Sequence, residues 1–101
     1  MENTLSDKPL RPRADPRPNS GPKVLIVDDI PENIALLSQL LAPKGYVIYE
    51  AFNGREALEM VEALNPDVLL LDLVMPEMNG FEVCERLKRD FRTRHIPVIM
   101  I

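Results

Sequence analysis

The sequence predicts an α/β fold in which helices cover both faces of a parallel sheet. Four short apolar runs alternate along the chain with three segments whose apolar residues recur at helical spacing. The strand-like runs are continuously apolar, as in strands buried on both faces, and this pattern is typical of parallel sheets. Each strand–helix–strand unit is expected to be right-handed, as nearly all such crossovers are.

The composition divides the chain at Pro22. Residues 1–22 contain five of the ten prolines, only four apolar residues and a net charge of +1, so we expect a disordered leader rich in proline and arginine. Residues 23–101 contain the other 42 apolar residues and carry a net charge of −5. This second segment is long enough for one domain and too short for two.

The composition also argues against several functional classes. The acidic balance of residues 23–101 argues against direct binding of nucleic acid, which requires a basic face. A single cysteine excludes a disulfide framework within the chain and fits a reducing compartment. No apolar stretch approaches the length of a membrane span, and residues 1–10 lack the apolar core of a secretory signal. We therefore expect a cytoplasmic protein.

In the first half of the segment, residues 24–27 and 46–49 form the first two expected strands. Between them, Pro31 suits the first turn of a helix, and residues 43–45, Pro-Lys-Gly, end that helix. The apolar positions of this helix are Ile34, Leu37, Leu40 and Leu41.

In the second half, Asn53 is the expected N-cap of a second helix, which ends at residues 65–66, Asn-Pro. Its apolar positions are Ala57, Leu58, Val61 and Leu64. Residues 68–71 form the third strand, and a loop over residues 73–80 leads to a third helix. The third helix is expected to bury Phe81, Cys84 and Leu87, with Cys84 as a small apolar filler.

Residues 97–101 begin the fourth expected strand, where the sequence ends. An uncovered strand of this kind would expose the edge of a sheet. The apolar residues expected at that edge are Ile96, Val98, Ile99 and Ile101. We therefore expect either a piece of a longer domain or a homo-oligomer in which another chain completes the sheet.

Three carboxylates follow the expected strands at the edge where open α/β sheets bind ligands. Asp28 and Asp29 end the first strand, and Asp72 ends the third. If these strands are neighbours, as in the strand order 2-1-3-4, the three side chains converge. Clustered carboxylates repel one another unless a cation neutralises them, and a set of oxygen ligands without histidine or cysteine selects Mg²⁺ or a similar ion.

Three segments of the chain resemble the receiver domain of two-component response regulators: VLIVDD at residues 24–29, LLLDLVMPEMNG at 69–80 and IPVIMI at 96–101. The resemblance covers residues 23–101. It implies a flavodoxin-like, doubly wound parallel sheet with strand order 2-1-3-4. Receiver domains are themselves an example of this order, so the topology is taken from the family as well as from the residues. Compared with the family, the fifth strand and the last two helices are absent from this sequence.

The resemblance implies a phosphorylation switch. Asp72 would accept a phosphoryl group from a histidine kinase or a phosphotransfer protein, with Mg²⁺ as the cofactor. Asp29 would bind the metal directly and Asp28 mainly through water, while Asp72 and the backbone carbonyl of Val74 would each supply one oxygen. The chain would then be a signalling module and not an enzyme acting on a separate substrate. At most it would transfer a phosphoryl group to itself.

The family also uses a Ser or Thr just after strand four and a Lys at the end of strand five, and both positions would follow Ile101. The resemblance therefore predicts the acceptor and the metal ligands in this chain, but not the hydroxyl and lysine groups that contact the phosphoryl group in the family. Switching by this chain on its own is left open, and an output domain would belong to a longer parent chain.

Two other functions fit parts of the sequence. One is a metal-dependent α/β phosphotransferase. Such enzymes usually place two acids two residues apart after the first strand, whereas here adjacent acids precede Ile30. The other is a structural fragment that pairs with a partner through the open edge of strand four.

Overall fold

The computed structural model describes residues 21–101, so the leader predicted for residues 1–22 lies outside the described residues apart from Gly21 and Pro22. The described chain forms one sheet of four parallel strands in the order β2-β1-β3-β4, which confirms the predicted fold class. The elements, in chain order, are β1 (Lys23–Val27), α1 (Pro31–Leu41), the 3-10 helix η1 (Ala42–Lys44), β2 (Val47–Ala51), α2 (Gly54–Leu64), β3 (Val68–Leu71), α3 (Gly80–Arg89) and β4 (Val98–Met100).

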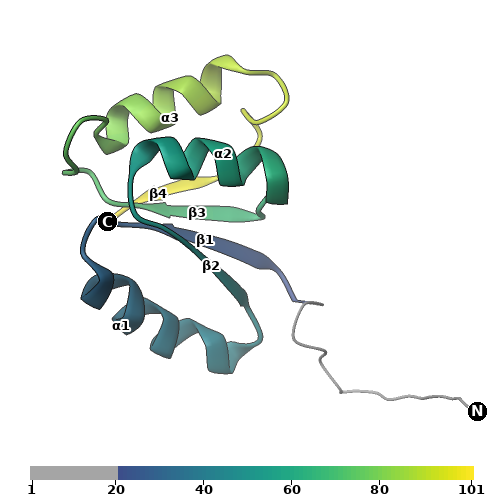
Figure 1. Ribbon diagram of the computed structural model, residues 1–101. Helices are drawn as coiled ribbons and strands as arrows, with labels where there is room; N and C mark the ends of the chain where they lie inside the picture. The colour runs from purple at the N-terminus through teal and green to yellow at the C-terminus, as the bar shows by residue number, and fades with distance from the viewer. Residues whose placement is uncertain (1–20) are drawn as a thin grey trace, which may run out of the picture.

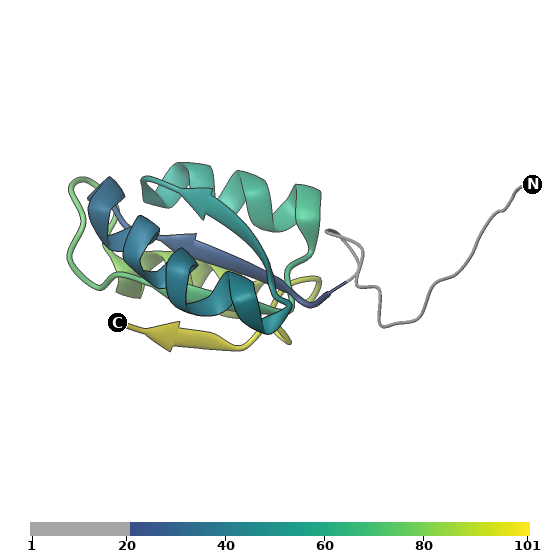
Figure 2. The same cartoon turned by 90° about the horizontal axis from the view of Figure 1, so that it is seen from below.

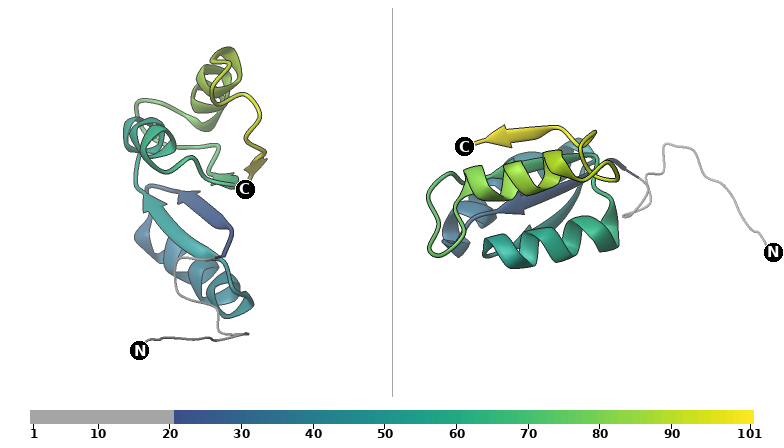
Figure 3. Two further views of the ribbon diagram at one scale, coloured as in Figure 1. Left: turned by 90° about the vertical axis from the view of Figure 1, so that its right-hand side faces the viewer. Right: turned by 90° about the horizontal axis from the view of Figure 1, so that it is seen from above.

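The molecule has three layers, with α1 on one face of the sheet and α2 and α3 on the other (Figure 1). In the view from below, α1 lies over the β1–β2 side and β4 runs along the open edge of the sheet (Figure 2). Figure 3 shows the layers end-on and from the α2–α3 side. None of the described helices combines the length and apolar character that a membrane crossing requires.

The central strand β1 explains why the sheet is buried on both faces. Side chains alternate across a strand, so Val24 and Ile26 pack with Ile34 of α1 while Leu25 and Val27 join the core under α2 and α3. All four of these β1 residues are buried. The continuously apolar run in the sequence therefore correctly predicted a central strand.

Local signals in the sequence also predicted where the helices begin and end. Helix α1 begins at Pro31, and Gly45 follows η1 with a φ of 95°, a left-handed conformation that glycine adopts without strain. The side chain of Asn53 accepts a hydrogen bond of 2.8 Å from the backbone N–H of Glu56 and so caps α2. At the other end of α2, Asn65 adopts the left-handed conformation that ends the helix.

Two predicted helix faces were partly wrong. Leu40 is 59% exposed, whereas Ile34 of α1 is buried. In α3, Phe81 is 65% exposed and Cys84 is only partly buried, while Val83 and Leu87 fill the core. Adjacent residues point about 100° apart around a helix. Because Gly80 faces inward at the start of α3, the buried side falls on Val83 and Leu87, and Phe81 is turned out.

The ends of two strands were also misplaced. Strand β2 spans Val47–Ala51 and not residues 46–49, because Val47 is the residue that pairs with Lys23 at the start of β1. At the fourth strand, Ile96 is fully buried and was wrongly expected at an open edge. Ile99 and Ile101, by contrast, are about half exposed, as expected for that edge.

Candidate functional site

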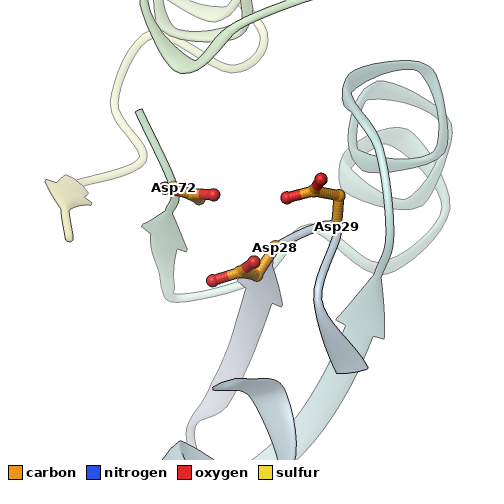
Figure 4. Close-up of side chains that lie close together, drawn as sticks. All are labelled: Asp28, Asp29 and Asp72. Atoms are coloured by element: carbon orange, nitrogen blue, oxygen red, sulfur yellow. The ribbon is translucent and has the colours of Figure 1, made fainter. Parts of the chain in front are cut away.

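Asp28, Asp29 and Asp72 lie together at the carboxyl edge of the sheet, as the sequence predicted (Figure 4). Val27 pairs with Leu71 across β1 and β3, so the residues that follow the two strands begin at the same level. One carboxylate oxygen from each of the three aspartates lies within 4.8 Å of the others. Residues more than forty positions apart in the sequence are therefore brought into one cluster.

Asp28 is held in place by hydrogen bonds to its main chain and its side chain. Its N–H donates to the carbonyl of Ala51 at 3.1 Å, which extends the β1–β2 ladder. Its Oδ1 accepts from the N–H of Ile30 at 2.9 Å, and its Oδ2 accepts from Nδ2 of Asn33 at 3.1 Å. The residue is only 4% exposed, so these donors offset part of the cost of burying a carboxylate.

Asp72 is fixed in a similar way at the end of β3. Its N–H donates to the carbonyl of Val27 at 2.9 Å, and its Oδ1 accepts from the N–H of Val74 at 3.3 Å. Burial raises the pKa of Asp72 above its ordinary value, and the charges of Asp28 and Asp29 raise it further, while the Val74 N–H acts in the opposite direction. The site therefore gathers negative charge around Asp72 and makes the ionised form of this side chain less favourable than in water.

The loop from Asp72 to α3 is held close to the carboxylates by backbone contacts. The N–H of Gly80 donates to the carbonyl of Leu73 at 2.9 Å. A Cβ on Gly80 would lie 2.5 Å from the carbonyl oxygen of Asp72, so only glycine fits this position without displacement. Glu77 has a φ of 69°, and the N–H of Met78 donates to the carbonyl of Pro76 across it, which forms a rare tight turn of the γ type.

Two further features anchor this loop. Met75 is 6% exposed and packs into the core under α2 and α3. Asn79 and Glu82 form a reciprocal capping box at the start of α3, with hydrogen bonds of 3.0 Å in both directions. The spacing Asn-x-x-Glu could have predicted the capping box from the sequence. No sequence signal marked the left-handed conformation of Glu77.

All the residues expected to hold a metal lie at the site. The carboxylates of the three aspartates converge, whereas the observed contact of Val74 is made by its backbone N–H. The Val74 side chain is 75% exposed, and its N–H contacts Asp72; a role for its carbonyl as a ligand stays a prediction. Sequence reasoning did not find Asn33, because its contact with Asp28 depends on how the chain turns at Ile30. Within residues 21–101 the cluster offers carboxylate oxygens and neither histidine nor cysteine, a donor set that fits a hard divalent cation.

Comparison with known proteins identifies the family. The model of the response regulator receiver domain matches residues 24–101. The chain belongs to the response regulator receiver family. Receiver domains are signalling modules of phosphorelays, so the predicted family is confirmed together with its general function.

Known relatives of this receiver include proteins much longer than the matched region. The response regulator PleD of Caulobacter vibrioides is 47% identical over 79 residues, which cover 78% of this chain and 17% of PleD. A probable cyclic di-GMP phosphodiesterase of Vibrio cholerae is 50% identical over 78 residues, covering 77% of this chain and 18% of that protein. This receiver therefore spans less than a fifth of either relative.

Solved structures support the same conclusion about the fold. The crystal structure of the N-terminal domain of a response regulator receiver protein from Methanoculleus marisnigri matches with a TM-score of 0.76 and 44% identity. The match covers 77% of this receiver and 63% of that chain.

Removing the charge of Asp72 is expected to stabilise the receiver when no divalent cation is present. The raised pKa means that the folded state binds this proton more tightly than the unfolded state, so stability falls as pH rises from 3.8 through the folded-state pKa. The penalty therefore grows as pH rises above 3.8 and is larger near pH 7 than in acid. The carboxylate oxygens of the cluster lie within 4.8 Å of one another. Asp72→Asn should then be more stable by about 1 kcal/mol, the order of the repulsion between two unit charges about 4 Å apart in water.

Urea unfolding in EDTA, followed by circular dichroism, measures this difference. It should be present near pH 7 and absent below about pH 3, where Asp72 is protonated in both states. A variant that is no more stable than the wild type near pH 7 would contradict the expected repulsion.

Proposed function

We propose that this receiver is a Mg²⁺-dependent phosphoacceptor that takes a phosphoryl group onto Asp72 from a histidine kinase or a phosphotransfer protein. The observation that carries the proposal is the convergence of three carboxylates within 4.8 Å at the ends of β1 and β3. Membership of the receiver family supports it, because phosphoryl relay is the general activity of that family.

The chemistry at Asp72 is a transfer between two nucleophiles. A carboxylate oxygen of Asp72 attacks the phosphorus of a phosphohistidine, an O–P bond forms, and the P–N bond breaks. The electron pair of that bond stays on the imidazole nitrogen. The imidazole leaves neutral, either because its other ring nitrogen already carries a proton or because the ring takes up a proton from solvent. The product is an acyl phosphate on Asp72, and no other covalent bond in the receiver changes.

Charge is the main obstacle to this transfer, because an anion approaches an anion beside two further carboxylates. A bound Mg²⁺ would supply the positive charge that offsets this repulsion. Asp29 is more exposed than Asp28 and suits direct contact with the metal. Both oxygens of Asp28 already accept hydrogen bonds, which suits contact through water. The Val74 carbonyl would complete the protein's share of the ligands.

The wider context of the receiver is also a proposal. PleD and the probable phosphodiesterase are much longer than the regions matched here, which make up 17% and 18% of their lengths, and this supports an output domain in a longer parent chain. Domain limits of 1–22 for a leader and 23–101 for the partial receiver, and a cytoplasmic location, stay predictions from the sequence. The acidic balance of residues 23–101 supports a protein partner more than direct contact with nucleic acid.

The structure offers one observation in favour of the alternative pairing function. Strand β4 is an outer strand of the described sheet, and Ile99, Met100 and Ile101 next to that edge are 37–51% exposed. Light scattering over a range of concentrations tests pairing through this edge. A dimer that is lost in Ile99→Lys, together with an absence of any phosphorylation, would favour pairing over phosphoacceptance.

Chelation tests the proposed metal dependence. With acetyl phosphate and Mg²⁺, intact-protein mass spectrometry should show one added phosphoryl group, and EDTA should abolish it because the repulsion at Asp72 is then not offset. Asp29→Asn should require a much higher Mg²⁺ concentration. Labelling that proceeds equally well in EDTA would refute the role of the metal.

A further inference from the structure

Asn33 links helix α1 to the carboxylate cluster. It lies in the first turn of α1, and its Nδ2 donates to Oδ2 of Asp28 at 3.1 Å. Its own backbone N–H donates to the carbonyl of Ile30 at 3.0 Å, while the N–H of Ile30 donates to Oδ1 of Asp28 at 2.9 Å. Asp28, Ile30 and Asn33 are thus joined by three hydrogen bonds, so the start of the helix and the carboxylate are fixed relative to each other.

These bonds restrict how the Asp28 carboxylate can turn. With one donor on each oxygen, rotation about the Cβ–Cγ bond would break at least one hydrogen bond of a residue that is only 4% exposed. A carboxylate oxygen accepts more than one hydrogen bond or ligand, so each oxygen keeps capacity for the cluster. The geometry therefore presents Asp28 to Asp29 and Asp72 in one orientation.

The amide donor also acts on the charge balance of the site. Asp28 is buried beside two other carboxylates within 4.8 Å, and the neutral amide of Asn33 gives Oδ2 a hydrogen-bond donor without adding a positive charge that would compete with a cation. A lysine or arginine here would weaken cation binding, and an apolar residue would leave Oδ2 of Asp28 without this partner. Asparagine combines the needed donor with zero net charge.

We infer that Asn33 is a positioning residue for the Mg²⁺ site, which acts by orienting Asp28 and does not itself touch the metal. This inference rests on the proposed function, since it concerns the same site. Partners that orient metal ligands typically contribute about 10- to 100-fold to metal affinity. Because Asn33 is itself exposed and water can partly replace its amide, the expected effect is at the lower end, about 5- to 10-fold.

The test compares two alanine substitutions on the same helix. Asn33→Ala removes the donor, and Gln39→Ala removes an exposed amide of α1 that has no place in the site. Alanine is a good helix former, so neither change should prevent folding. Titration calorimetry with MgCl₂ should show a dissociation constant about 5- to 10-fold higher for Asn33→Ala and unchanged for Gln39→Ala.

Two further measurements separate positioning from a purely structural role. In EDTA, the urea midpoint of Asn33→Ala should lie slightly below that of Gln39→Ala, because Oδ2 of the buried Asp28 loses a donor, but the variant should stay fully folded in the calorimetry buffer. In labelling by acetyl phosphate, Asn33→Ala should need more Mg²⁺ for half-maximal rate and reach nearly the wild-type rate at saturation. Asn33→Gln, which keeps an amide donor, should recover part of the lost affinity.

The outcomes distinguish this inference from the proposed function. If the wild type binds Mg²⁺ and Asn33→Ala binds it as tightly as Gln39→Ala, the positioning role is refuted while the proposed function stands. If Asn33→Ala is weaker only in proportion to a general loss of stability in EDTA, Asn33 has a structural role alone and the inference is again refuted. If the wild type does not bind Mg²⁺, the proposed function fails and the inference fails with it.

Discussion

Asp72→Asn is expected to lose all phosphorylation by acetyl phosphate, while the wild type gains one phosphoryl group in the presence of Mg²⁺. An amide is neutral and its oxygen is a poor nucleophile, so the acyl phosphate cannot form. The fold should be retained, because the oxygen of the introduced amide can still accept from the N–H of Val74 as the Asp72 carboxylate does. Intact-protein mass spectrometry measures the number of added groups directly.

A matched variant in the same loop provides the control. Glu77→Gln also replaces a carboxylate with an amide, but Glu77 is exposed and lies outside the carboxylate cluster, so its labelling should equal that of the wild type. The label on the wild type should be released by hydroxylamine, which cleaves acyl phosphates. Labelling of Asp72→Asn to the wild-type level would place the acceptor at another residue and overturn the assignment.

Gly80→Ala is expected to cause the largest loss of stability among single substitutions at the site. The added Cβ would lie 2.5 Å from the carbonyl oxygen of Asp72 and 3.0 Å from Cα of Leu73, and backbone atoms cannot rotate away as a side chain can. Forcing extra atoms into a packed region costs about 1–3 kcal/mol, and the rigid neighbours put this case at the upper end, about 3 kcal/mol. Urea unfolding followed by circular dichroism measures the loss.

The same substitution should also slow phosphorylation, because relief of the clash moves the backbone of Asp72. Misplacement of a reacting group by about 1 Å can reduce a rate by about 100-fold. Gly45→Ala is the control: Gly45 has a φ of 95° but nothing within 4 Å of its added Cβ, so it should lose only about 1 kcal/mol from backbone strain. Its labelling rate should be unchanged. Equal effects of the two substitutions on both measurements would contradict the steric argument.

The sequence predicted the sheet and the carboxylate cluster because both depend on features that are local or general. The apolar run at residues 24–27 is typical of a strand buried on both faces, and parallel strands bring their carboxyl ends to one edge of the sheet. Once β1 and β3 are neighbours, Asp28 and Asp72 must follow paired residues. The order of the strands was taken from the family resemblance, since local pattern does not determine which strands pair.

The remaining features depend on tertiary contacts that no local pattern carries. The rotation of α3 is determined by the close approach of Gly80 to the backbone of Asp72, and this turned Phe81 outward against expectation. The bond between Asn33 and Asp28 requires the turn at Ile30, and the burial of Ile96 requires the chain to pack under α3 before β4 begins. Hydrophobic spacing alone could not distinguish these arrangements from alternatives in which the buried position shifts by one residue.

The main-chain N–H groups of the two strand-end aspartates belong to the sheet itself, since that of Asp28 bonds to Ala51 and that of Asp72 to Val27. Amide deuterium exchange at both positions should therefore require opening of the central strands, and its rate should approach that of global unfolding. The N–H of Val74, which bonds only to a side chain in an exposed part of the loop, should exchange many times faster. Slowly and rapidly exchanging amides would thus lie two residues apart. Any rearrangement that accompanies modification of Asp72 would then be confined to the loop that follows it, while the strand that precedes it stays fixed.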